Sequence, residues 1–240
     1  MSTLFARNQS QRPAAVPLLH NGDRLTQPEF HRRYEAHPGR EKFELIGGIV
    51  YMASPLRKPH SDYDDEFGFE LGLYRRATPG VEVLHNASVI LGLTSEPQPD
   101  LGMRIVPEFG GQSRDTPDQP DQYIEGAPEL LAEIAHSTFA MDMHQKKRDY
   151  QRAGVREYVV VCIEEQQLYW FNFKTGRLLR PDTRGIYRSL VFPGVWIDGP
   201  AVLARKSARI ARIVRQGLKS PEHAAFVKRL QSAFRRRSES

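Results

Sequence analysis

A single carboxylate inside an otherwise apolar run most constrains how this chain can fold. Glu133 is enclosed in the run from Glu129 to His136, and short apolar runs of this kind are typical of a strand covered on both faces. An unpaired charge in such a strand is costly. A carboxylate kept there indicates a metal ion, a partner charge or a reaction, so Glu133 is the first candidate functional residue.

The residues that follow predict a helix and then a second buried strand. Ser137 and Thr138 can cap a helix that ends near Ala153, and Gly154 stands where a C-terminal cap belongs. The apolar run Tyr158–Ile163 predicts the second strand. The predicted helix carries Asp142, Lys146, Lys147 and Tyr150. An acid on one strand, a lysine on the crossover helix and a parallel partner strand predict an α/β catalytic core.

The rest of the chain supplies further elements for a mixed sheet flanked by helices. Thr26 and Glu29 form a capping-box pattern that predicts a helix start, and Gly47-Gly48 predicts a hairpin within residues 43–52. Helical spacing of large apolar residues predicts a long helix over 60–76. The other expectations are strands over 81–93, 100–106, 167–173 and 186–192, a long loop over 107–127, and a helix over 201–218.

Composition argues against a membrane or secreted protein. No stretch approaches the ~18 consecutive apolar residues of a membrane span. Residues 1–25 lack the apolar core of a signal peptide, so we expect a cytoplasmic protein whose first 25 residues are disordered. Cys162, the one cysteine, excludes an internal disulfide, and its apolar strand favours an inert buried thiol over a nucleophile.

The net charge of +5 is distributed unevenly along the chain. Residues 205–240 hold eleven basic and two acidic residues, a net charge of +9, whereas residues 1–204 hold 23 basic and 27 acidic residues, a net charge of −4. We therefore divide the chain into a disordered segment (1–25), one domain (26–204) and a basic, partly helical tail (205–240). The tail suits contact with nucleic acid, and a plain solubilising extension is the alternative.

Asp100, Glu133 and Lys146 together suit phosphodiester hydrolysis. Mg²⁺ is held by one or two carboxylates and keeps several waters, and Asp100 and Glu133 can supply those carboxylates if their strands are adjacent. Lys146 can then orient or polarise the attacking water. Each residue also has an ordinary interpretation: a turn residue after Pro99 for Asp100, a buried ion pair for Glu133, and a solvated pair with Asp142 for Lys146.

The combined pattern resembles the Uma-type family of proposed restriction endonucleases, which belongs to the PD-(D/E)XK nuclease superfamily. The specific segment runs from Glu129 to Thr138, continues as Asp142-x-x-x-Lys146-x-x-x-Tyr150, and ends in Gly154-Val-Arg-Glu-Tyr158. Supporting matches are Thr26-x-x-Glu29, Phe43-Glu44-Leu-Ile-x-Gly48, His60 and Pro99-Asp100. The resemblance covers residues 26–200 and implies a restriction-endonuclease-like fold, with an N-terminal elaboration before the sheet.

Carried over by position, the resemblance implies that Asp100, Glu133 and Lys146 are catalytic. It makes Asp100 and Glu133 ligands of Mg²⁺ or Mn²⁺, with Glu44 as an additional acid, and DNA as substrate. The wider superfamily has its lysine two residues after the acid, where this chain has Ala135, and Lys146 matches the displaced lysine of the Uma-type family. Two departures are Ile49, where the family usually has an acid, and the missing proline after Ser137.

Two other classes of function remain open at this point. One is a non-catalytic nucleic-acid-binding or interaction protein on a nuclease fold, because fold does not establish turnover. The other is a structural homodimer whose acids form an ion-pair network. His60 could reach the site from the start of its helix, although histidines there more often cap or pack. His136 is interpreted as structural, and the aromatic run Tyr169–Phe173 as core or dimer interface. Convergence of the Asp100 and Glu133 carboxylates with the Lys146 amine would favour the nuclease.

Overall fold

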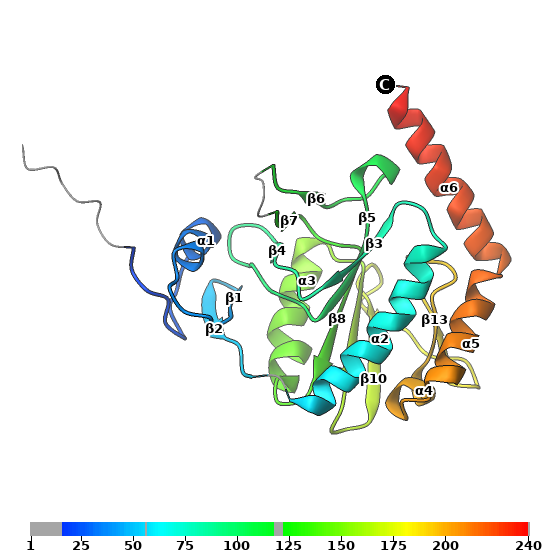
Figure 1. The fold of residues 1–240 in the computed structure, drawn as a ribbon, viewed down its shortest axis with the longest axis horizontal. Helices are drawn as coiled ribbons and strands as arrows, with labels where there is room; N and C mark the ends of the chain where they lie inside the picture. Colours follow the sequence, from blue (N-terminus) through cyan, green and yellow to red (C-terminus); the bar gives the residue numbers. More distant parts are fainter. Residues whose placement is uncertain (1–15, 56, 118–121, 240) are drawn as a thin grey trace, which may run out of the picture.

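The strand that carries Glu133 is a central strand of a six-stranded mixed sheet (Figure 1). The computed structural model describes residues 16–55, 57–117 and 122–239. The sheet order is β11-β10-β9-β8-β5-β3. β8 and β9 are parallel, as expected for strands joined by a crossover helix, and the other neighbouring pairs are antiparallel. The bounds are β3 Val81–His85, β5 Leu101–Ile105, β8 Leu130–Ala135, β9 Glu157–Cys162, β10 Gln167–Asn172 and β11 Arg177–Leu178.

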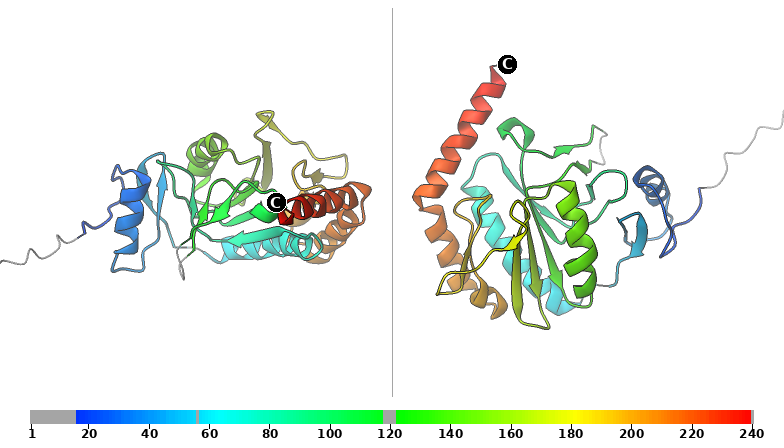
Figure 2. Two further views of the ribbon diagram at one scale, coloured as in Figure 1. Left: turned by 90° about the horizontal axis from the view of Figure 1, so that it is seen from above. Right: turned by 180° about the vertical axis from the view of Figure 1, so that it is seen from behind.

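Helices cover both faces of this sheet (Figure 2). Alternate residues of β8 belong to the core on each face. One set packs in the core beneath α2 (Lys58–Arg76), and the other packs with Tyr150 of α3 (Lys147–Ala153). Successive side chains of a strand point to opposite faces, so Glu133 belongs to the α3 face. The α2 set is Leu130, Ala132 and Ile134, and the α3 set is Leu131 and Ala135.

The long helix predicted over 60–76 is confirmed as α2, which begins two residues earlier at Lys58. Its apolar stripe of Tyr63, Phe67, Leu71 and Tyr74 is buried against the sheet. Burial of each large apolar side chain contributes about 1.5–3 kcal/mol, which fixes the helix on this face. The N-terminal end of α2, with His60, is thereby held beside the start of β5.

The N-terminal elaboration has a small core of its own. α1 (Gln27–Glu35) packs on the hairpin of β1 (Phe43–Ile46) and β2 (Ile49–Met52). The hairpin is confirmed, and Gly47 and Gly48 both adopt positive φ (59° and 78°), which residues with a Cβ rarely do. The buried residues of this core are Leu19, Phe30, Phe43, Leu45 and Val50.

Two expectations for the N-terminal region need correction. The helix does begin after Thr26, but the Thr26 side chain makes no capping hydrogen bond, and Glu29 pairs with Arg32 and Arg33 instead. Expected disorder does not hold for residues 16–25, because Leu19 is buried and the Gly22 amide donates to the Val50 carbonyl at 2.8 Å. Residues 1–15 lie outside the described part of the chain.

The region expected as one strand and a long loop contains a second small sheet. The strand expected over 81–93 is split at Asn86, whose φ is +48°. The expected loop over 107–127 contributes two short strands to a three-stranded sheet of order β4-β7-β6. These elements are β4 Val89–Ile90, the 3-10 turn Pro107–Phe109, β6 Arg114–Asp115 and β7 Ile124–Glu125.

The C-terminal part adds a hairpin and three helices along one side of the molecule (Figure 1). Ile210, Val214, Phe226 and Leu230 are buried, and Ile210, Phe226 and Leu230 belong to the same core as α2. The boundary at Ala204 stays a prediction, but the helices beyond it share the main core. No described helix is long and apolar enough to span a membrane. The bounds are β12 Ile186–Arg188, β13 Trp196–Asp198, α4 Gly199–Leu203, α5 Ser207–Leu218 and α6 Pro221–Ser238.

Candidate active site

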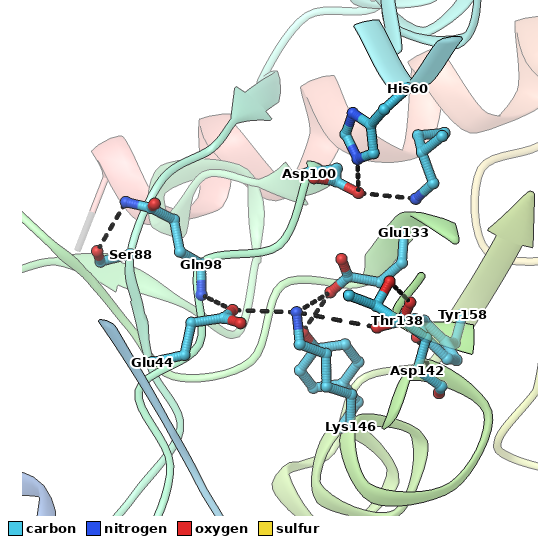
Figure 3. A network of polar contacts seen from close by, with 12 residues as sticks. Glu44, His60, Ser88, Gln98, Asp100, Glu133, Thr138, Asp142, Lys146 and Tyr158 are labelled. Carbon is cyan, nitrogen blue, oxygen red and sulfur yellow. Dashed lines mark hydrogen bonds and ion pairs between the residues drawn. The ribbon is translucent and has the colours of Figure 1, made fainter. Parts of the chain in front are cut away.

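Glu133 is buried and receives two hydrogen bonds on one oxygen (Figure 3). Lys146 donates from Nζ to Glu133 Oε1 at 3.1 Å, and the Tyr150 hydroxyl donates to the same oxygen at 2.7 Å. The other oxygen, Oε2, has no hydrogen bond to the described residues. The carboxylate is therefore held in one orientation with one oxygen left available.

Lys146 lies between carboxylates from three elements. Its Nζ is 3.0 Å from Glu44 Oε1 on β1, 3.1 Å from Glu133 Oε1 on β8, and 4.0 Å from Asp142 Oδ1 one turn earlier. Only 7 % of the side chain is exposed, so the alternative of a solvated surface pair is wrong. Burial alone would lower the pKa of the ammonium, but the surrounding carboxylates, Glu133 first, outweigh it and raise this pKa well above its usual range.

A π-helical turn places Lys146 on the side of α3 that faces β8. The turn spans Met141–Lys146 and continues directly into α3, so the predicted helix after Thr138 is confirmed with a local widening. π turns are frequent at functional sites. Lys147 points elsewhere, as expected from its position, because its Nζ lies 4.1 Å from the centre of the Phe171 ring.

Asp100 stands directly before β5 and opposite Glu133. The antiparallel register pairs Leu101 with Ala132, and continuing it by one residue pairs Asp100 with Glu133. Directly opposed residues on antiparallel strands have neighbouring side chains. Asp100 Oδ2 accepts a hydrogen bond from the Ile134 amide at 2.7 Å and pairs with His60 Nε2 at 3.1 Å. Its Oδ1 has no hydrogen bond to the described residues.

Glu44 brings the N-terminal hairpin to the cluster. Its Oε1 accepts a hydrogen bond from the backbone amide of Gln98 at 2.7 Å and also contacts Lys146. The hairpin turn is fixed to α3, because Asp149 Oδ2 accepts from the Gly47 amide at 2.6 Å. The elaboration thus closes one side of the candidate site.

Burial makes two acids of this cluster, Glu133 and Asp142, harder to ionise. It raises the pKa of Glu133 well above the usual range, and the nearby charges of Asp100, Asp142 and Glu44 add to this while Lys146 opposes it. Burial also raises the pKa of Asp142 to about 6, against the lowering effects of Lys146 and Thr138. Three carboxylates share one ammonium and the charge of Asp100 is nearby, so the cluster favours additional positive charge.

The donor set fits a hard divalent cation in its chemistry. Asp100 Oδ1 and Glu133 Oε2 stand on opposed strand positions and accept no hydrogen bond from the described part of the chain, and Mg²⁺ needs only one or two carboxylates with waters. In residues 16–239, apart from the two undescribed gaps, no three His, Cys, Asp or Glu converge as a ready-made metal cluster. The position among Glu44, Glu133 and Asp142 is taken by the Lys146 amine.

The structure brings Asp100, Glu133, Lys146 and Glu44 together and adds residues that sequence reasoning missed. The sequence left open whether His60 reaches the site or only caps or packs, and it contacts Asp100 from the third residue of α2. Tyr150 had a visible signal, its spacing of four from Lys146, but no role was given to it. His136 lies away from the cluster, 4.0 Å from Glu164. The aromatic hairpin packs in the core, with Trp170 fully buried.

A protein-family model described as Uma2, putative restriction endonuclease, matches residues 27–200. The chain belongs to the Uma2 family. Among solved structures it resembles a putative nuclease belonging to DUF820 from Anabaena variabilis ATCC 29413, with a TM-score of 0.56 and 14 % identity over 75 % of this chain and 99 % of that chain. This likeness confirms the predicted fold. No curated protein matches the chain.

Proposed function

We propose that this Uma2 protein is a metal-dependent endonuclease that hydrolyses phosphodiester bonds of DNA. The observation that carries the proposal is the contact of Lys146 on the crossover helix with buried Glu133, while Asp100 stands opposite Glu133 on the neighbouring strand. Membership of a family whose description is putative restriction endonuclease supports the same activity.

Each residue has a distinct part in the proposed chemistry. Asp100 and Glu133, assisted by Glu44, would hold Mg²⁺ or Mn²⁺. When bound, such a cation neutralises phosphate charge and lowers the pKa of water. Tyr150 fixes the Glu133 carboxylate, and the Ile134 amide with His60 fixes Asp100. Lys146 supplies a compact positive charge that orients the attacking water and stabilises charge developing on the phosphate.

The direct test is cleavage of supercoiled plasmid and of single-stranded DNA by the purified protein, with and without Mg²⁺ or Mn²⁺. We expect cleavage that requires the cation and that Glu133→Gln abolishes, because the amide keeps the shape of the side chain but not its charge. Equal cleavage by the wild type and Glu133→Gln would contradict the proposal.

A second candidate is a non-catalytic nucleic-acid-binding or interaction protein on the same fold. The observation that favours it is the Lys146 amine, which is shared by three carboxylates and could act as a permanent counter-ion. This alternative predicts DNA binding without cleavage under any divalent ion. It also predicts that Lys146→Ala changes stability but no reaction rate.

A further inference from the structure

The C-terminal helices carry an uncompensated positive surface outside the family-matched region. All eleven Lys and Arg residues beyond Ala204 are exposed, whereas the family match ends at residue 200. Arg205 and Arg209 pair with Asp62 and Asp198. The side chains of six others make no hydrogen bond, ion pair or ring contact with any described residue. These six, named here the α5–α6 basic surface, are Lys206, Arg212, Arg215, Lys219, Lys228 and Arg235.

The basic residues occupy the outward faces of two helices whose apolar faces are already covered. Arg212, Arg215 and Lys219 follow the three-and-four spacing of one helix face, opposite buried Ile210 and Val214. On α6, Lys228 and Arg235 are seven residues apart and lie opposite the buried side chains of that helix. The two helices run in succession along one side of the molecule (Figure 2).

We propose that the α5–α6 basic surface binds the phosphate backbone of duplex DNA that flanks the cleavage site. This inference rests on the proposed nuclease function. The surface offers charge to a polyanion and no base-reading groove, so it suits binding without sequence preference. An anionic membrane is a poorer partner, because interfacial helices insert an apolar face and the apolar face of α5 is buried in the core.

The N-terminal part of α2 connects one end of the α5–α6 basic surface with the candidate active site. Arg205 contacts Asp62 at 2.6 Å near the first turn of α2, and His60 on the same turn contacts Asp100. α5 and α6 follow one another along the side of the molecule on which α2 lies (Figure 1). The contact of α2 with Asp100 and its contact with Arg205, which directly precedes Lys206 of the basic surface, are therefore two residues apart on the same helix.

The test compares two triple variants that remove the same charge. One is Arg212→Gln, Arg215→Gln and Lys219→Gln on α5. The control is Lys174→Gln, Arg177→Gln and Arg180→Gln, three exposed basic residues around β11 with no side-chain partner among the described residues. Binding to a duplex of about 30 base pairs, roughly 100 Å long at about 3.4 Å per base pair, is followed by fluorescence anisotropy in EDTA across a salt series.

We expect the α5 variant to reduce the magnitude of the slope of log K against log salt by about 2.7, at about 0.9 for each phosphate that the protein no longer neutralises. The control should keep the wild-type slope. Wild-type affinity and slope in the α5 variant would overturn the proposal, as would an equal reduction in the control. Wild-type binding to phosphatidylserine vesicles with no binding to duplex DNA would also overturn it.

Failure of this proposal is distinguishable from failure of the nuclease function. If the wild type cleaves no DNA but the α5 variant loses binding in EDTA, the basic surface stands and the nuclease function fails. If the wild type cleaves DNA in a cation-dependent way and the α5 variant binds normally, the basic surface alone is contradicted. Circular dichroism of each variant confirms that the substitutions leave the helices folded.

Discussion

Two buried glutamates, Glu133 and Glu70, have opposite surroundings. Glu133 meets the Lys146 ammonium and the Tyr150 hydroxyl, and one of its oxygens stays available beside Asp100. Glu70, on α2, is 1 % exposed, and neither of its oxygens has a hydrogen-bond partner among the described residues. Burial, with the nearby charges of Glu66 and Asp198, raises the pKa of Glu70 well above its usual range.

The contrast shows that burial of an acid is not by itself the mark of an active site. Glu70 is buried near other acids and has no cationic partner among the described residues, so its surroundings favour the neutral acid. Glu133 has a cationic partner and a second carboxylate on the neighbouring strand, so it belongs to a charged cluster that a divalent ion can complete. The partners of a buried acid therefore decide whether its burial only destabilises the fold or also forms a place where a cation can bind.

The largest effect is expected from removing Lys146, the cationic partner that Glu133 has and Glu70 lacks. Lys146→Ala should reduce single-turnover cleavage by roughly a hundredfold to ten-thousandfold, because the compact charge acts on the reacting groups. Arginine at this position should rescue poorly, since its planar fork cannot replace an ammonium. Lys147→Ala is the matched control, because Lys147 lies over the Phe171 ring and away from Glu133.

Comparing cleavage by Lys146→Ala and Lys147→Ala distinguishes three explanations. An active Lys146→Ala beside an inactive Lys147→Ala would show that the wrong lysine has been assigned. Normal cleavage by both variants would remove the lysine from the mechanism. Cleavage lost only in Lys146→Ala, with circular dichroism unchanged, is the result expected for the proposed site.

A smaller effect is expected at His60, which positions Asp100 and does not touch the reacting groups in our account. His60→Ala should reduce cleavage and Mn²⁺ affinity by about 10- to 100-fold, the usual cost of losing a residue that orients a metal ligand. His60→Asn should restore part of both, because its amide can still donate to Asp100. His136→Ala, a histidine away from the cluster, should change neither.

The smallest effect concerns stability at Glu70. Its pKa is higher in the folded protein than the unfolded value of 4.5, so the folded state binds more protons and stability falls as pH rises above 4.5. Glu70→Gln should therefore raise the free energy of unfolding at pH 7, because the amide carries no charge that burial would oppose. The gain should disappear near pH 4.5.

Urea unfolding at several pH values measures this effect. Asp65→Asn is the control, since Asp65 is exposed on the same helix and should change stability by about 0.5 kcal/mol or less at every pH. A gain that does not depend on pH would mean that Glu70 is not the titrating group. Loss of stability in Glu70→Gln would show that the buried carboxyl has a partner that the amide cannot replace.

The sequence correctly predicted the strands, the hairpin and the helix whose formation leaves a pattern in neighbouring residues. The apolar runs of β8 and β9, the paired glycines of the first hairpin and the helical spacing of α2 each report burial or backbone conformation directly. The spacing of Asp142, Lys146 and Tyr150 likewise predicted one shared helix face, and the structure brings all three to the Glu133 side.

Features that depend on pairing or packing between distant segments could not be predicted from the sequence. The register that sets Asp100 opposite Glu133 is decided by strand pairing, and the three-stranded sheet joins Val89 to Ile124 across a long stretch of chain. The role of His60 depends on how α2 lies against β5. The burial of Ile210 and Phe226 in the main core depends on packing, so composition alone indicated only a basic tail.

Calorimetric titration with Mn²⁺ tests the central claim most directly, that Glu133 is kept in the sheet to hold a cation. The account predicts that Glu133→Gln weakens Mn²⁺ binding by roughly tenfold or more, at about 1.4 kcal/mol per decade, because one of two carboxylates at the site is lost. Glu70→Gln should bind Mn²⁺ like the wild type. Equal affinity of the wild type and Glu133→Gln would contradict the account.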